Sequence, residues 1–516
     1  MADGPTFPYR KEVRSGPYSS HPDGKLPPLL QYTGYLPEHR EIYLAFFADL
    51  TQQAAQLVGQ DYSKPVQEFK QAIESNKILY DLVQEIFVQV DPQYQYEHSV
   101  KDWEDMLRKL DVILSGPPKF YIAKDNNQKP IGEPVGVPIY VMMDLLNNTL
   151  AGFDLFRNVD FNNAMRNLLN AWGEYLTTEN SNKTLNTTDE GWFSKYSLAE
   201  LQSKGRGVFT NNFIVRNEDP DKGYGFTSWD DFFVRRLKEG ARPIHDLRDL
   251  PINYDVPRDI DPGLVIHHAC ESTAVRITEN VRLHDKFWLK AQQYSLYDML
   301  NRDPSAEEFV GGSVYQTFLS PQDYHRWHSP VDGTIVKAEV VNGAYYSALP
   351  DDGAPADEPG SNLKPGVPFG AYLRSQPWLT FVATRALIWI RAKDPRIGLL
   401  CFIGIGMAEV STCDIKAAQD LVGKEVKTGQ EIGMFHFGGS GHCLVFRRDA
   451  QIKFSFPELL ADGAPDPSNA SRQKIPAGSL PHIESSTGDD QPMERYKYIY
   501  GWHLRVNSII GWSEAK

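Results

Sequence analysis

The sequence predicts an α+β protein, in which a helical amino-terminal module precedes a mainly β domain. Two observations support this class. Between about residues 40 and 180, apolar residues recur at three- and four-residue spacing, which is the period of amphipathic helices. Past about residue 205 they gather in short β-branched and aromatic runs bounded by Gly, Pro or Asp, as strands do. A chain of 516 residues also exceeds what one core usually accommodates, so at least two domains are expected.

The helical period is clearest in three segments: Val66–Val90, Ile139–Phe156 and Phe161–Leu176. A further helix start is predicted at Thr227–Phe233, where Thr or Ser can cap and acidic residues follow in the first turn. We expect a flexible segment at residues 1–40, a helical domain at 41–205 and a second domain at 206–516.

Six runs in this part of the chain have the composition of strands. Two polar, Pro- and Gly-rich segments interrupt them, and we expect both to be surface loops. The predicted strands are Val314–Leu319, Thr334–Val341, Ala386–Ala392, Leu399–Val410, Glu431–Phe437 and Cys443–Phe446, and the loops are Pro350–Pro368 and Ala461–Pro492.

Composition excludes several classes of function. The formal net charge of −14 and the lack of a basic patch argue against a nucleic-acid or anionic-membrane partner. No run reaches the roughly 18 apolar residues that a membrane-spanning helix needs, and the first residues lack a signal-peptide core, so we expect a cytoplasmic protein without a membrane anchor. Four scattered cysteines predict neither a disulfide framework nor a zinc site; each is expected to be a reduced core residue.

Two segments carry unusual chemistry: Phe318–Gly333 (FLSPQDYHRWHSPVDG) and Met434–Phe446 (MFHFGGSGHCLVF). In the first, His325 and His328 lie three residues apart; in the second, Ser440 follows a diglycine. Taken singly, each has an ordinary structural interpretation. A histidine is more often hydrogen-bonded than catalytic, Gly-Gly-Ser is usually a turn, and no third ligand supports a metal site.

Two other functions fit these segments less well. The run around Ser440 is not the G-x-S-x-G elbow of hydrolases. The hairpin-like Val426–Gly433 suggests a biotinyl or lipoyl carrier, but no lysine at a hairpin tip is evident.

Together the motifs resemble the phosphatidylserine decarboxylase family. Phe318–Gly333 is similar to that family's run with two catalytic histidines, and Glu431–Ser440 is similar to its cleavage strand, which ends in Gly-Ser. Ser228–Ile244 resembles the start of the family's catalytic domain. This resemblance covers about residues 225–460 and implies a phosphatidylserine-decarboxylase-like catalytic domain within 206–516, cut by the chain itself between Gly439 and Ser440.

The resemblance also implies a mechanism. Decarboxylation of an α-amino acid needs an electron sink, which ordinary side chains do not supply. A pyruvoyl group made from Ser440 would supply it by forming a Schiff base with the substrate amine. His328 matches the histidine of self-cleavage, and His325 matches the histidine of the decarboxylation cycle. The cleaved chains are expected to remain associated.

Two positions depart from the family pattern. Glu271, in the run ACES, stands where the family's triad Asp is usual, and Asp323 is the alternative acid for orienting His328. Gly441 and His442 follow Ser440 where Thr or Ser and an apolar residue are commoner. We predict Glu271 as the orienting acid; the candidate substrate-pocket residues are Trp327, His436 and His442.

A narrower resemblance, to the fungal L-tryptophan decarboxylases of the psilocybin pathway within this family, extends upstream. It rests on PVQEFKQAIES (Pro65–Ser75), GVPIYVMMDLLNNTLAGFDLF (Gly136–Phe156) and AWGEYLTT (Ala171–Thr178). It favours a small aromatic amino acid as substrate over a phospholipid. Two alternatives stay open: a phosphatidylserine decarboxylase that acts at a membrane, and an inactive family member that serves as a binding protein.

Overall fold

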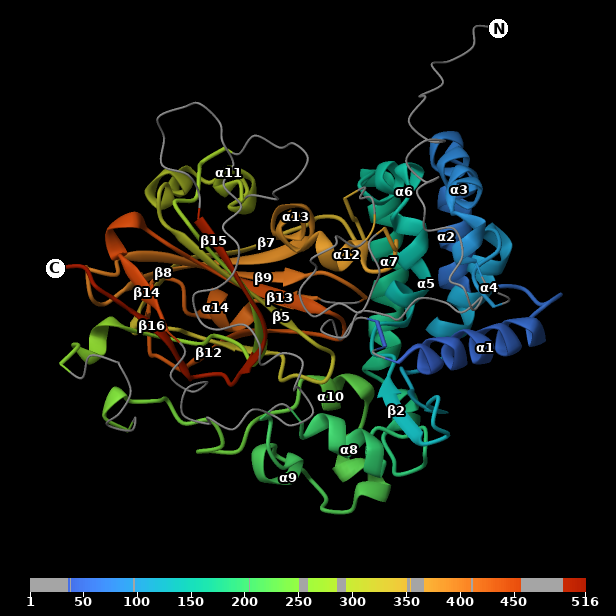
Figure 1. The fold of residues 1–516 in the computed structure, drawn as a ribbon, viewed down its shortest axis with the longest axis horizontal. Helices are drawn as coiled ribbons and strands as arrows, with labels where there is room; N and C mark the ends of the chain where they lie inside the picture. Colours follow the sequence, from blue (N-terminus) through green and yellow to red (C-terminus); the bar gives the residue numbers. More distant parts are fainter. Residues whose placement is uncertain are drawn as a thin grey trace, which may run out of the picture.

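The helices of the amino-terminal part gather at one end of a large β-sheet (Figure 1). The computed structural model describes residues 36–37, 39–95, 98–203, 205–249, 259–284, 294–349, 353, 366–409, 412–455 and 495–516. Most of the segment 1–40 expected to be flexible, the loop 461–492 and most of the loop 350–368 lie outside these residues. The observed order is helices first and then a mostly β part, which confirms the predicted α+β class.

Helices form where the period of three and four predicted them, and capping residues set their ends. Val66–Val90 divides into two helices because the Asn76 side chain accepts the backbone N–H groups of Ile78 and Leu79. Thr149 divides the next segment in the same way. The helices of this part are α1 (Arg40–Gln56), α2 (Lys64–Glu74), α3 (Lys77–Gln89), α4 (Trp103–Leu114), α5 (Pro138–Asn147), α6 (Leu150–Phe156), α7 (Val159–Leu176) and α8 (Lys195–Leu201).

One hairpin in this part was not predicted: β1 (Phe120–Lys124) pairs antiparallel with β2 (Pro130–Pro134). Short helices follow along the chain, and in α10 the Ser228 side chain caps the first turn, as the sequence predicted. These helices are α9 (Phe209–Asn212), α10 (Trp229–Phe233), α11 (Leu296–Met299), α12 (Ala371–Arg374), α13 (Gln376–Val382) and α14 (Lys416–Asp420).

The large sheet has eight antiparallel strands in the order β11-β7-β8-β9-β13-β5-β4-β15. Its strands are β4 (Ser272–Glu279), β5 (Ser313–Leu319), β7 (Gly333–Val341), β8 (Thr384–Ala392), β9 (Leu399–Gly406), β11 (Glu425–Val426), β13 (Ser440–Phe446) and β15 (Arg495–Leu504). Two three-stranded sheets accompany it: β10 (Cys413–Asp414), β12 (Glu431–Phe435) and β6 (Arg326–His328), and β14 (Ile452–Phe454), β16 (Ile509–Ser513) and β3 (Val265–His267).

The large sheet is buried on both faces, since every residue of its central strands β5, β9 and β13 is buried. On β13, Cys443 and Val445 belong to one core and Leu444 and Phe446 to the other. The first core continues without a break into the helices α1 to α7. The helical part therefore shares its core with the sheet. The cysteines at 270, 401, 413 and 443 are all buried, as expected of core residues.

Candidate active site

Ser440 opens β13 in the middle of the large sheet. Its register partners are Leu319 at the end of β5 and Gly406 at the end of β9, so three strand ends meet at this point. The residue is fully buried, and its Oγ has no hydrogen-bond partner among the described residues. This end of the sheet faces the helices, since the Phe437 ring lies 5.2 Å from the Trp172 ring of α7. A buried hydroxyl without a partner is costly in a purely structural serine.

The carbonyl before Ser440 lies in a cradle of two backbone donors. The N–H groups of Met407 and Ala408 donate to the Gly439 oxygen at 3.2 and 3.0 Å. Two donors on one carbonyl oxygen polarise it and would stabilise an oxyanion that forms there, as in the oxyanion hole of acyl-transfer enzymes. Gly438 has a φ of 146°, which side chains rarely adopt, so the turn that presents this carbonyl depends on glycine.

His325 lies close to the same turn. Its ring stacks on Phe233 with centroids 3.9 Å apart, and Phe233 lies 5.4 Å from Phe437. Neither ring nitrogen has a well-formed hydrogen bond to a described residue. Burial lowers the pKa of His325 to about 3, against a smaller opposing effect from Asp323. The imidazole is therefore neutral at physiological pH in the uncut chain, where burial makes it a weak base.

His328 is held by two other groups. Its Nδ1 lies 2.7 Å from the Gly429 carbonyl, which can only accept, so Nδ1 carries the proton. Its Nε2 then accepts from the Tyr324 hydroxyl at 2.9 Å. Burial lowers the pKa of His328, which leaves this ring neutral as well. The nitrogen available as a base, Nε2, faces Tyr324 in the uncut chain.

Glu271 is buried, as expected, but its hydrogen-bonding partner is a different residue from the predicted one. Both carboxylate oxygens accept from Arg242, from Nε and Nη2, each at 2.7 Å. The expected pair with His328 is not formed, because both nitrogens of that ring are bonded elsewhere. Glu271 is linked to His328 less directly, since the nearby Ala269 carbonyl accepts the His328 backbone N–H at 2.8 Å.

Asp323, the alternative acid, is also engaged elsewhere. Its carboxylate accepts from Arg206 Nε at 2.7 Å, from His503 Nε2 at 2.9 Å and from Ser320. Burial alone would raise the pKa of Asp323, but the charge of Arg206 and the contact with His503 hold it well below its usual range. Asp323 therefore anchors the loop that carries the two histidines and makes no direct contact with His328.

The three candidate pocket residues lie in different surroundings. Trp327 is fully buried, and its ring packs on Phe402 and Phe435 at 5.1 and 4.6 Å, as a core side chain does. His436 is partly exposed; burial alone would lower its pKa, but the bond to Asp230 at 2.8 Å raises it.

His442 shares the face of β13 with Ser440, because alternate residues of a strand point the same way. It is fully buried, its Nδ1 lies 2.6 Å from Thr317 Oγ1, and burial lowers its pKa. Between them, Gly441 accommodates a close approach: a Cβ there would meet the Thr317 carbonyl at 2.7 Å. That contact gives a physical reason for glycine where the family commonly has Thr or Ser.

Sequence reasoning missed the groups that hold these residues. Arg242 lies inside the motif Ser228–Ile244 and Tyr324 inside the histidine motif, so the motifs could have indicated both. No sequence feature could have indicated the cradle at Met407 and Ala408, because it is made of backbone N–H groups, which do not depend on a particular residue type.

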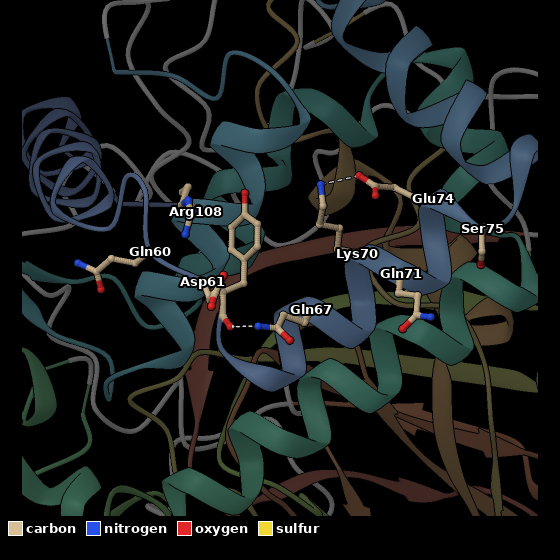
Figure 2. Close-up of a pocket in the computed structure, with 9 residues that line it drawn as sticks. Gln60, Asp61, Gln67, Lys70, Gln71, Glu74, Ser75 and Arg108 are labelled. Atoms are coloured by element: carbon tan, nitrogen blue, oxygen red, sulfur yellow. Dashed lines mark hydrogen bonds and ion pairs between the residues drawn. The ribbon is translucent and has the colours of Figure 1, made fainter.

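A polar hollow between α2 and α4 lies outside this site (Figure 2). Lys70 there is paired with both Glu74 and Glu104, so its charge is already neutralised. None of the residues predicted for chemistry lines the hollow, which is formed by Gln60, Asp61, Tyr62, Gln67, Lys70, Gln71, Glu74, Ser75 and Arg108.

Within the described ranges, no group of three His, Cys, Asp or Glu side chains is placed to hold a metal ion. No helix in that part of the chain is both long and apolar enough to cross a membrane.

Comparison with known proteins shows the family to which a chain with this fold belongs. Two family models, both described as phosphatidylserine decarboxylase, match residues 63–201 and 229–463. The chain belongs to this family and is a decarboxylase.

Three relatives illustrate the range of the similarity. Decarboxylase iboD of Amanita muscaria is 48% identical over 351 residues, which cover 68% of this chain and 94% of the relative. The L-tryptophan decarboxylase of Psilocybe cyanescens is 32% identical over 442 residues, covering 83% and 91%. A phosphatidylserine decarboxylase proenzyme of Clostridium tetani is 29% identical over 258 residues, covering 50% and 73%.

Proposed function

We propose that this protein cuts itself between Gly439 and Ser440, converts Ser440 into a pyruvoyl group and decarboxylates a free amino acid. The observation that carries the proposal is the pairing of a buried, unpartnered Ser440 hydroxyl with a Gly439 carbonyl held by two N–H donors. A nucleophile beside a polarised carbonyl is what an intramolecular acyl shift requires. The name proenzyme, borne by the clostridial relative, supports processing.

The cut follows from ordinary acyl chemistry. Ser440 Oγ attacks the Gly439 carbonyl carbon and gives its proton to a base, and the cradle N–H groups stabilise the oxyanion. Breaking the C–N bond leaves an ester and a free Ser440 amino group. Loss of the Ser440 α-proton expels the Gly439 carboxylate, and the resulting dehydroalanine tautomerises. Water then releases ammonia and leaves the pyruvoyl group at the new amino terminus.

The two histidines are assigned different steps. We assign His328 as the base of the cut, acting through Nε2 once Tyr324 releases it. His325 is assigned the proton transfers of the decarboxylation, because neither of its ring nitrogens is engaged by a described residue and both can meet a substrate. Glu271 supports His328 through the backbone, since the nearby Ala269 carbonyl accepts the His328 N–H, and Asp323 anchors the segment that carries both rings. His442 and His436 remain candidates for contact with substrate.

The pyruvoyl group would supply an electron sink for the carbanion formed when CO2 leaves. After the cut, β13 belongs to the smaller fragment yet stays bonded to β5 and β9 of the larger one. The two fragments are therefore expected to remain associated. Both neighbours of β13 contribute seven paired residues, so separation would expose a central strand on both sides.

A free amino acid is favoured over a phospholipid because the similarity to the L-tryptophan decarboxylase covers most of both chains. The first substrate to test is an aromatic L-amino acid, tryptophan or a close analogue, which would reach a cytoplasmic enzyme from solution. Phosphatidylserine is the second, since it names the family and the clostridial relative.

Denaturing electrophoresis of the purified protein tests the cut. Because 439 of 516 residues precede Ser440, the 58.4 kDa chain should give pieces of about 50 and about 9 kDa. Ser440→Ala should give one uncut chain without activity, whereas Ser513→Ala, a buried serine on β16, should be cut normally. Two fragments from Ser440→Ala would refute the assignment.

Carbon dioxide release from tryptophan and from phosphatidylserine vesicles tests the substrate. Release from tryptophan alone supports the proposal. Release only from the vesicles would make the protein a phosphatidylserine decarboxylase. An uncut wild-type chain that releases none from either would favour the inactive binding protein.

A further inference from the structure

Glu409 is a buried acid that the mechanism above does not use. It directly follows the cradle residues Met407 and Ala408 and is fully buried. Among the described residues its carboxylate contacts no cation; Oε1 accepts the Tyr140 backbone N–H at 2.9 Å and Oε2 accepts the Tyr346 hydroxyl at 3.0 Å. Burial accordingly raises the pKa of Glu409 to about 8. A buried acid without a countercharge is costly and calls for a reason.

The first contact places Glu409 at the amino end of α5. Tyr140 is the third residue of this ten-residue helix, and its N–H is one of the donors that a helix leaves without an internal partner. Val137 precedes the helix and makes no side-chain cap, so Glu409 serves as the cap from 269 residues away. The helical part of the chain is thereby joined to the end of β9.

The second contact fixes the backbone beside the cradle. Glu409 has a φ of 57°, an uncommon conformation for a residue with a side chain. Its backbone N–H donates to the Tyr346 hydroxyl at 3.0 Å, while the same hydroxyl donates to its carboxylate. Tyr346 itself has a φ of 56°. Strained residues of this kind persist only where surrounding contacts hold them, and they concentrate at functional sites.

We propose that Glu409 is a positioning residue for self-cleavage, which docks the amino end of α5 against the strand end whose N–H groups hold the Gly439 carbonyl. This inference rests on the proposed function. One unbroken path runs from Tyr140 through the Glu409 carboxylate to its backbone, and from there through Ala408 to the scissile carbonyl. The helical part of the chain is therefore required for the cut, and the chain cuts only after the helices have packed on the sheet.

The matched control is Asp144, a second buried acid of the same region. It accepts the Tyr140 hydroxyl at 2.7 Å and the Gly370 N–H, and lies on α5. None of these contacts involves residues 407–409. Asp144→Asn should therefore leave both the docked amino end of α5 and the cradle in place, whereas Glu409→Gln removes one of the two oxygens that accept the Tyr140 N–H and the Tyr346 hydroxyl.

The experiment follows cutting of freshly translated chains by denaturing electrophoresis. Glu409→Gln should cut about tenfold more slowly or worse, because losing even one oxyanion donor outright costs about 100-fold or more. Asp144→Asn should cut at close to the wild-type rate. Thermal unfolding of both changes in a Ser440→Ala background reports stability separately. If Glu409→Gln fails to fold, Tyr346→Phe, which removes the hydroxyl that holds the Glu409 N–H, should slow the cut instead.

Two results would overturn the inference. One is wild-type cutting by both Glu409→Gln and Tyr346→Phe. The other is equal slowing by Asp144→Asn and Glu409→Gln at equal loss of stability, which would reduce Glu409 to a packing role. A wild-type chain that is never cut would instead refute the proposed function itself, so the two failures are distinguishable.

Discussion

Replacement of Glu271 by Gln probes the buried pair that supports the histidine loop. The pair consists of side chains that are 1% and 3% exposed, joined by two charge-assisted hydrogen bonds of 2.7 Å. Removing one partner of a buried pair costs about 3–5 kcal/mol, since the other charge is left without compensation. Arg242 keeps three further acceptors: Asn212 Oδ1, the Ala241 carbonyl and the Arg206 carbonyl. We therefore expect the free energy of unfolding to fall by about 3 kcal/mol, at the lower end of this range.

The same change should slow the cut at least about tenfold. A tenfold slower cut corresponds to a rise of only about 1.4 kcal/mol in the activation barrier, which is less than half of the stability lost with the pair. The path to the site is short, because Ala269, two residues before Glu271, accepts the His328 N–H. Electrophoresis of translated chains measures the rate, and chemical unfolding in a Ser440→Ala background measures the stability.

A double substitution separates a direct role of the carboxylate from a structural one. Arg242→Gln alone should destabilise the chain comparably, and Glu271→Gln with Arg242→Gln should recover stability, because two amides leave no buried charge. If the double variant cuts at the wild-type rate, the role of Glu271 in cutting is limited to its pairing with Arg242. Slow cutting at recovered stability would show that the carboxylate itself acts on His328. Unchanged cutting and stability in Glu271→Gln would refute both accounts.

Two further predictions concern histidines. His328→Ala should block cutting, whereas His325→Ala should cut at least partly but decarboxylate poorly; normal behaviour of both variants in electrophoresis and CO2 release would contradict the assigned roles. Burial lowers the pKa of His325 and of His268 to about 3, so between pH 6.5 and 3 the folded chain binds fewer protons than the unfolded one. The stability from keeping these rings neutral is fully present above pH 6.5 and is lost as the pH falls. Between pH 7.5 and 5.5, each of the two histidines should lower the free energy of unfolding by about 1.4 kcal/mol, as measured by urea unfolding of the Ser440→Ala protein. The substitution His325→Gln should remove the contribution of His325. A flat profile would refute the prediction.

Local patterns in the sequence determined which segments become helices and strands. The period of three and four residues predicted α2, α3 and α5 to α7, and the short apolar runs predicted β5, β7, β8, β9, β12 and β13 within a few residues. The motifs also identified Ser440, His325 and His328 as candidates, since each motif is continuous in the chain. The strand β4 and the hairpin β1–β2 were missed, because their residues carry no clear alternation.

The partners of the site residues were decided only by the tertiary structure. Glu271 was expected to meet His328, but the chain brings Arg242 to it from 29 residues upstream. A sequence shows that a buried carboxylate needs a partner and cannot show which one arrives. The cradle at Gly439 is made of backbone N–H groups, which every residue except proline carries, so no residue type marks it. Glu409 and the amino end of α5 meet across 269 residues, and that contact exists only once helices and sheet share one core.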